Sequence, residues 1–203
     1  VMWRFRAGAN PKPSRTTHNT MLEIVWTAVP VLILVVIAFP SFKLIYYEDR
    51  TPEADVTVKA IGRQWYWSYA YPDHGNFSFD AFMLSREEAE EAGEPALLAT
   101  SEDVVVPAGA TVRMLITASD VLHSWAVPAF GVKRDAIPGR LNETWFRVEE
   151  PGMYYGQCSE LCGVGHGFMP IAVRVVPQAE FDAWIEQAQA RYGTEDDTSV
   201  AQR

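Results

Sequence analysis

Most residues of this chain that could do chemistry lie in one twelve-residue stretch, CSELCGVGHGFM, from Cys158 to Met169. It contains both cysteines of the 203-residue chain, four positions apart, together with His166 and Met169. Thiolate, imidazole and thioether groups form a soft ligand set that suits copper. A second imidazole is available at His123, in the segment SDVLHSW that follows a predicted strand.

Three interpretations of the two cysteines compete. A structural disulfide is common in domains that face an oxidising compartment. Zinc takes thiolates and imidazoles, but in its usual sites the two histidines are close in sequence, and here they are far apart. A single blue-copper ion needs one Cys, two His and a weak axial Met, which leaves Cys158 without a role. Two thiolates that bridge two copper ions would give both cysteines a role.

A membrane span is predicted upstream of this stretch. The run from Ile24 to Phe42 carries no charge over nineteen residues, close to the roughly 20 residues that cross a bilayer core. No face of the run is polar, which disfavours a helix buried in a soluble protein. Pro30 and Pro40 are tolerable in a membrane helix. The run is too long for a signal peptide, and no small-residue cleavage site follows it.

The charge distribution predicts how the span is oriented. Four Lys/Arg and a single acid, Glu23, precede it, whereas the remainder of the chain has thirteen Lys/Arg against twenty-five Asp/Glu. The positive-inside rule places the basic segment in the cytoplasm and the acidic body on the outer side. An acidic body argues against binding nucleic acid and suits a basic partner.

The residues after the span predict an all-β domain, because short runs rich in β-branched and aromatic residues alternate with Pro/Gly turns. Many short strands of this kind indicate a Greek-key sandwich or barrel. SREEAEEAG is predicted to be a surface helical turn, and QAEFDAWIEQAQARYG has the apolar spacing of a helix. The predicted strands lie in VTVKAIG, WYWSYAYP, DVVVPAGATVRMLITAS (two strands), TWFRVEEPGMYYGQC (two strands) and IAVRVV.

Together with DVLHSWAVPAFGVKRDAIPGRLN and GRQWYWSYAYP, the cysteine stretch resembles subunit II of the haem–copper cytochrome c oxidases. The resemblance runs from HNTMLEIVWT to MPIAVRVVP, and the opening VMWRFR resembles the end of a first membrane helix. It implies a cupredoxin-like Greek-key barrel with an N-terminal transmembrane helix and a short C-terminal helix. The expected divisions are a cytoplasmic segment at 1–23, the membrane helix at 24–47, a linker at 48–55, the copper domain at 56–177, and a C-terminal helix and tail at 178–203.

The resemblance also implies a dinuclear copper centre, CuA. Two thiolates would bridge two copper ions, and each ion would take one imidazole. His123 would share its ion with Met169, and the other ion would take the backbone carbonyl of Glu160. The Glu160 carboxylate would also reach a magnesium ion shared with subunit I. The expected metal ligands are therefore His123, Cys158, Glu160, Cys162, His166 and Met169.

Two residues outside the copper loop receive roles only through the resemblance. From the residues alone, Trp65 and Trp67 alternate with Tyr66 in a strand, and an aromatic core is the simplest interpretation. The resemblance makes Trp65 the exposed tryptophan at which electrons enter. Glu23 is explained by the helix dipole as a first-turn acid, whereas the resemblance places it at the mouth of a proton path into subunit I.

The acidic surface is expected to dock cytochrome c. By resemblance Asp120 belongs to that surface, and Glu102, Asp103 and Asp73 are its expected neighbours. Ala70 and Gly75 stand at positions that are often acidic in the family, so this chain departs from the family pattern there.

The function implied is that of the electron-accepting subunit of an aa3-type cytochrome c oxidase. Single electrons from cytochrome c would pass through CuA to haem a of subunit I, where haem a3 and CuB reduce oxygen to water, coupled to proton pumping. Subunit III and membrane lipid are further expected partners. The expected location is the bacterial inner membrane with the copper domain in the periplasm, or alternatively the mitochondrial inner membrane facing the intermembrane space. A CuA domain of a nitrous-oxide-reductase type and a metal-free quinol oxidase subunit are the alternatives.

Overall fold

The computed structural model describes residues 1–193 in two compact units, of which the first ends at Tyr47 and the second begins at Glu48. Helix α1 (Thr20–Glu48) is the main element of the first unit. Its start is capped reciprocally: the Leu22 N–H donates to Asn19 Oδ1 (3.1 Å), and the Asn19 N–H donates to Glu23 Oε1 (3.2 Å). The helix is long and apolar enough to cross a membrane, and none of its side chains is buried.

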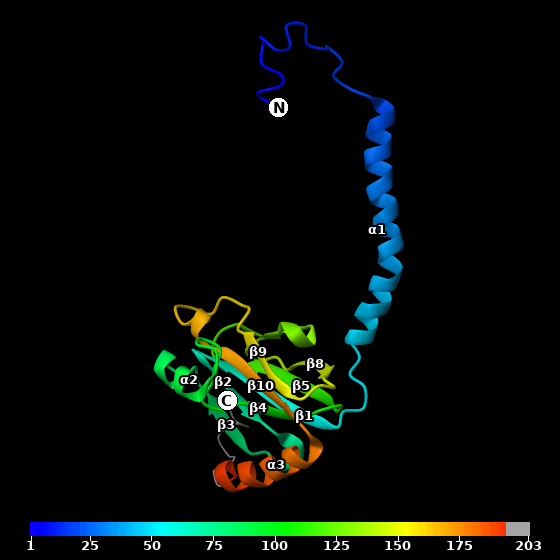
Figure 1. The fold of residues 1–203 in the computed structure, drawn as a ribbon. Helices are drawn as coiled ribbons and strands as arrows, with labels where there is room; N and C mark the ends of the chain where they lie inside the picture. The colour runs from blue at the N-terminus through cyan, green and yellow to red at the C-terminus, as the bar shows by residue number, and fades with distance from the viewer. Residues whose placement is uncertain (194–203) are drawn as a thin grey trace. The chain divides into compact units, whose positions relative to one another are not determined.

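The second unit is built from three sheets (Figure 1). The largest has the strand order β3-β2-β1-β5-β8, the second β4-β10-β9, and the third pairs β6 with β7. The pairs β1·β5 and β4·β10 are parallel, and the other pairs are antiparallel. The strands are β1 (Val56–Arg63), β2 (Tyr66–Ala70), β3 (Ser78–Ala81), β4 (Val104–Pro107), β5 (Thr111–Ala118), β6 (His123–Val127), β7 (Val132–Ala136), β8 (Asn142–Arg147), β9 (Gly152–Gln157) and β10 (Pro170–Val176).

The core of the β domain follows from side-chain alternation. In β5, Val112, Met114 and Ile116 are buried, whereas the side chains between them are only partly buried. Trp67 from β2 and Trp125 from β6 are both fully buried within the same cluster. Burying aromatic rings of this size contributes strongly to the stability of the domain. The core therefore fixes the strands from which the loops at the edges of the sheets project.

Two short helices complete this unit. Helix α2 (Arg86–Ala92) begins with a capping box between Ser85 and Glu88. Helix α3 (Gln178–Tyr192), drawn in orange to red in Figure 1, contacts β4 and buries Phe181, Ile185 and Ala188, one face at helical spacing. Three 3-10 turns are η1 (Pro72–His74), η2 (Pro128–Phe130) and η3 (His166–Phe168). The predicted C-terminal tail, 194–203, lies outside the described residues.

The strands and helices predicted from sequence patterns are all present. Three strands were not predicted, namely β3, β6 and β7. The placement of Trp65 within a strand was wrong, because β2 begins at Tyr66 and Trp65 belongs to the turn between β1 and β2. Strand alternation therefore does not determine which way the Trp65 ring points.

Candidate metal centre

The cysteine stretch forms the connection between two paired strands. Pro170 of β10 pairs with Gln157 of β9, so residues 158–169 leave and rejoin the sheet at neighbouring positions. We call these residues the metal loop. The Ser159 N–H donates to the carbonyl oxygen of Ser124 (3.0 Å), which ties the loop to β6. His123 is the first residue of β6, so this bond brings the upstream histidine beside the loop.

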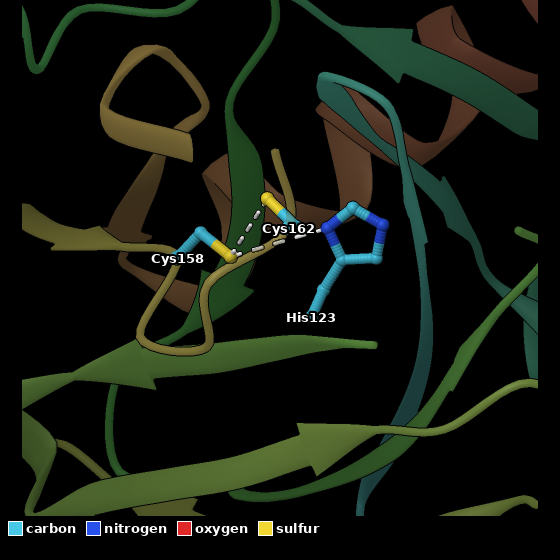
Figure 2. Close-up of side chains that lie close together, drawn as sticks. All are labelled: His123, Cys158 and Cys162. Atoms are coloured by element: carbon cyan, nitrogen blue, oxygen red, sulfur yellow. Dashed lines mark hydrogen bonds between the residues drawn. The ribbon is translucent and has the colours of Figure 1, made fainter. Parts of the chain in front are cut away.

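Two sulfurs and one imidazole converge at the centre of this arrangement (Figure 2). Cys158 Sγ lies 3.9 Å from Cys162 Sγ and 4.0 Å from His123 Nδ1. All three side chains are buried, and His123 has no exposed surface. Both cysteines are free thiols, so the disulfide interpretation does not describe this structure.

Three further donor atoms lie around the same two sulfurs. Cys162 Sγ is 3.6 Å from His166 Nδ1 and 3.6 Å from Met169 Sδ. The carbonyl oxygen of Glu160 lies 3.4 Å from Cys158 Sγ. Met169 is buried, whereas His166 and Glu160 are half-buried. The structure therefore brings together all six residues that were expected to be metal ligands.

The donor set fits a pair of soft metal ions. Metal–sulfur bonds of about 2.3 Å and metal–nitrogen bonds of about 2.0 Å keep two donors on one ion within roughly 4 Å of each other. The neighbouring donor atoms in this site are 3.4 to 4.0 Å apart. Two thiols, two imidazoles, a thioether and a carbonyl exceed the four ligands of one tetrahedral zinc ion. A thioether donor suits copper rather than zinc. The residues present therefore fit copper, and their number fits two ions better than one.

The two thiols differ in acidity. Burial raises the pKa of Cys158, but hydrogen bonds with His123 and with the backbone of Ser124 and Glu160 outweigh it and lower that pKa to about 6. Burial, followed by the negative charge on Cys158, raises the pKa of Cys162 to about 12. Cys158 is therefore the more acidic of the two thiols. A bound cation deprotonates a coordinating thiol outright, so binding would release the Cys162 proton.

Asp120 sets the orientation of the His123 ring. Its Oδ1 atom accepts a hydrogen bond from His123 Nε2 at 2.8 Å, which leaves Nδ1 to face Cys158. A carboxylate on the far nitrogen is the usual way to fix a ligand histidine. The ring also packs against Gly62, where an added Cβ would lie 2.8 Å from His123 Cγ and Cδ2. Burial lowers the pKa of His123, but hydrogen bonds to Cys158 and Asp120 outweigh it and raise the pKa.

Trp65 lies directly beside the metal loop. Its ring is half-buried, and its Nε1–H donates to the carbonyl oxygen of Cys162 at 3.0 Å. The neighbouring Gln64 donates to the same oxygen from Nε2 at 2.9 Å. Sequence reasoning missed Gln64, and the only local signal was its place between Gly62 and the aromatic run WYW.

The four acids expected to dock cytochrome c occupy different environments. Asp120 lies at the metal loop, but each of its oxygens already accepts an internal hydrogen bond. Glu102 pairs with Arg191 (2.7 Å), and Asp103 pairs with Arg174 (3.2 Å). Asp73 lies beyond the opposite end of β2 from Trp65. The structure thus joins Asp120, but not Asp73, to the backbone of Gln64, the residue before Trp65.

Glu23 belongs to the first unit and sits in the first turn of α1. Its carboxylate accepts the Asn19 N–H, so it acts as a helix cap as well as an acid. A shallow hollow runs along this face of the helix, lined by Thr20, Glu23, Ile24, Thr27, Ala28 and Val31.

Comparison with known protein families matches both units of the chain. Residues 1–44 match the transmembrane domain of cytochrome c oxidase subunit II, and residues 56–176 match its periplasmic domain. The chain belongs to the cytochrome c oxidase subunit II family. It is therefore a membrane-anchored subunit II with a soluble domain of CuA type, a family that implies copper.

Individual relatives agree with this assignment. A probable cytochrome c oxidase subunit 2 of Rickettsia felis is 54% identical over 185 residues, which cover 91% of this chain and 58% of the relative. The cytochrome c oxidase subunit 2 of Cereibacter sphaeroides is 47% identical over 217 residues, covering 98% of this chain and 71% of the relative. The chain thus spans less than two thirds of the first of these proteins. Both are named as subunits of an oxidoreductase.

A solved structure supports the fold. The periplasmic domain of subunit II of cytochrome oxidase (CoxB) of Bradyrhizobium japonicum is 54% identical, with a TM-score of 0.66 over 70% of this chain and 99% of that chain. The prediction of a cupredoxin-like β domain with an N-terminal apolar helix and a C-terminal helix is confirmed.

Proposed function

We propose that this chain is the electron-accepting subunit of an aa3-type cytochrome c oxidase, taking single electrons from cytochrome c and passing them to haem a of subunit I. One observation carries the proposal, namely the convergence of two thiols, two imidazoles and a thioether on one buried point. Two copper ions held there would supply one-electron redox chemistry shared across the bridging thiolates. His123 and Met169 would complete one ion, and His166 with the Glu160 carbonyl the other.

The chain's own residues provide a site that is dry and rigid. Cys158, Cys162 and Met169 are each at most 5% exposed, so water is excluded from their sulfur atoms. His123 is held by its hydrogen bond to Asp120 and by close packing against Gly62. Ligands that are held in place in this way have little room to rearrange when one electron arrives or leaves. This rigidity supports a role in electron transfer rather than in binding a substrate.

The contact between Trp65 and the metal loop supports a route for the incoming electron. The indole N–H bonds the carbonyl of Cys162, so one hydrogen bond and a few covalent bonds connect the ring to a thiol sulfur. Asp120 accepts a hydrogen bond from the backbone of the preceding residue, Gln64, and its negative charge at the surface could steer a basic cytochrome c. Glu102, Asp103 and Asp73 are proposed to extend this field over the rest of the domain.

The remaining proposals concern the assembled oxidase. The carboxylate of Glu160 would reach a magnesium ion shared with subunit I, and subunit III would join the same complex. Glu23 would collect protons for subunit I at the cytoplasmic end of α1. The copper domain would face the periplasm, because the basic residues precede the helix and the acidic ones follow it. Reduction of oxygen at haem a3 and CuB, and proton pumping, would belong to subunit I.

A copper count with electron paramagnetic resonance tests the central proposal. The full chain should bind two copper ions and show the hyperfine pattern of one unpaired electron shared between two copper nuclei. One ion per chain, with the pattern of a single nucleus, would contradict the dinuclear centre. Preferential binding of zinc from a mixture of the two metals would contradict the copper assignment.

A further inference from the structure

The turn between β1 and β2 is attached to the metal loop through one carbonyl group. Gln64 Nε2 and Trp65 Nε1 both donate to the carbonyl oxygen of Cys162, at 2.9 and 3.0 Å. A carbonyl oxygen has two lone pairs, so it accepts both bonds at once. The two residues of the turn are thus joined side by side to the peptide group of a ligand residue.

Two glycines of the metal loop leave room for the Trp65 ring, because neither has a side chain that would meet it. An added Cβ at Gly165 would lie 2.4 Å from Trp65 Cγ and Cδ2, closer than real Cβ atoms approach. An added Cβ at Gly163 would lie 3.0 Å from Trp65 Cζ2 and 3.3 Å from Gln64 Nε2. We call these two glycines the glycine seat. Gly167, in the same loop, would meet nothing within 4 Å, so the bare surface is required only where the ring lies.

The backbone of Gln64 is attached to the other half of the donor set. Its N–H donates to Asp120 Oδ2 at 2.7 Å, and Asp120 Oδ1 accepts from His123 Nε2 at 2.8 Å. Gln64 therefore contacts a thiol-bearing residue through its side chain and an imidazole ligand through its backbone and Asp120. Gln64 thus links the Cys162 peptide group to the Asp120 carboxylate that orients His123.

We propose that Gln64 is a positioning residue which, with the glycine seat, holds the Trp65 ring at a fixed distance and angle from the Cys162 peptide group. The inference rests on the proposed function, in which electrons enter at Trp65. Trp65 follows the end of β1 in an exposed turn, where an aromatic side chain with a single hydrogen bond could swing into solvent. A second donor on the same carbonyl and a flat surface beneath the ring remove that freedom, so that every docked partner meets the same geometry.

Three substitutions in the assembled oxidase test this proposal. Gln64→Met keeps the length of the side chain and removes both amide donors, and Gly165→Ala places a methyl group under the ring. Gly167→Ala is the matched control, because its site is open. The first two should slow flash-initiated electron transfer by about tenfold or more, since a misplacement of about 1 Å can cost two orders of magnitude. The control should transfer at the normal rate, and the copper absorption spectrum should be unchanged in all three.

A second readout needs neither copper nor activity. In the full copper-free chain, the Trp65 indole N–H resonance is identified by its absence in Trp65→Phe. Its exchange with solvent should be slow in the original chain and in Gly167→Ala. It should be faster in Gln64→Met and in Gly165→Ala, because the ring leaves the Cys162 carbonyl more often.

The two readouts separate failure of this inference from failure of the proposed function. Normal transfer in Trp65→Phe would overturn the proposed entrance for electrons, while the exchange measurement would still report on the ring. Slow transfer in Trp65→Phe with normal transfer and exchange in Gln64→Met and Gly165→Ala would overturn the positioning role. A double variant of Gln64→Met with Trp65→Phe should be no slower than Trp65→Phe alone, and further slowing would also overturn it. If Gly165→Ala fails to bind copper, its slow transfer is uninformative, and the result for Gln64→Met alone tests the positioning role.

Discussion

The metal loop and helix α1 differ in how many of their contacts lie within the chain. At the metal loop, each thiol and the neighbouring His123 and Trp65 rings have partners in the same domain. Helix α1 buries none of its side chains, and within the described part of the chain its Glu23 carboxylate is hydrogen-bonded to the backbone of Asn19, which lies on the same turn. The arrangement of the candidate metal centre is therefore determined by contacts within this chain. The role proposed for α1 depends on lipid and on a partner subunit.

The largest expected effect is loss of the shared-electron copper centre in Cys158→Ser. A hydroxyl is a poor ligand for a soft metal, and Cys158 Sγ is the donor that faces Cys162, His123 and the Glu160 carbonyl. Copper titration and electron paramagnetic resonance of the full chain should show no unpaired electron shared by two nuclei. Gly167→Ala, in the same loop, should keep the original spectrum. A retained shared-electron signal in Cys158→Ser would show that Cys158 is not a bridging ligand.

The sequence was most informative where the signal is local. Both thiols, His166 and Met169 lie within twelve residues, and β5 shows its buried face by simple alternation. β6 was missed for a physical reason. Every residue of β6 is buried, so His123–Val127 has no polar face to mark a strand. Its five residues are also too few to be distinguished from a loop by composition alone.

The rest of the candidate site could not be predicted because it depends on contacts between distant segments. The bonds from Gln64 and Trp65 to Cys162 join residues 98 and 97 positions apart. Asp120 was expected on a docking surface, and nothing in its neighbourhood in sequence showed that its oxygens accept bonds from His123 and Gln64. Residue types therefore identified the ligands, whereas tertiary packing determined the groups that orient them.

The next largest effect is expected for Trp65→Phe. The phenyl ring cannot donate to the Cys162 carbonyl, so electron transfer inside the complex with cytochrome c should fall by orders of magnitude, while affinity for cytochrome c stays nearly the same. The cost in stability should be about 1–3 kcal/mol at most, because the ring is only half-buried. Flash-initiated transfer, a binding assay and a melting curve measure the three quantities.

Trp184→Phe is the matched control for this substitution. Trp184 packs on Tyr71 from helix α3, with ring centroids 5.1 Å apart, and has no contact with the metal loop among the described interactions. It should lower the melting temperature and leave electron transfer unchanged. If Trp65→Phe instead kept fast electron transfer and lowered the melting temperature, Trp65 would have a purely structural role.

A smaller effect is expected in α1, where Glu23→Gln tests whether the helix does more than anchor the domain. Glutamine keeps an oxygen that can accept the Asn19 N–H, so the start of the helix should be preserved. It cannot carry a proton at neutral pH, and turnover of the assembled oxidase should therefore slow while the copper spectrum is unchanged. Normal turnover with normal assembly would leave Glu23 with its capping role alone.

The smallest effects are expected from single docking acids. At about 0.15 M salt the screening length is about 8 Å, so exposed charges act weakly one at a time. Glu102 is partly neutralised by Arg191 at 2.7 Å, and Asp73 lies beyond the far end of β2 from Trp65. Glu102→Gln should raise the KM for cytochrome c by an amount equivalent to less than about 1 kcal/mol, and Asp73→Asn should change it still less. Steady-state kinetics over a series of salt concentrations measures both variants. A larger rise in KM for Asp73→Asn than for Glu102→Gln would indicate that cytochrome c docks away from Trp65. That result would contradict the proposal that electrons enter the domain beside the metal loop.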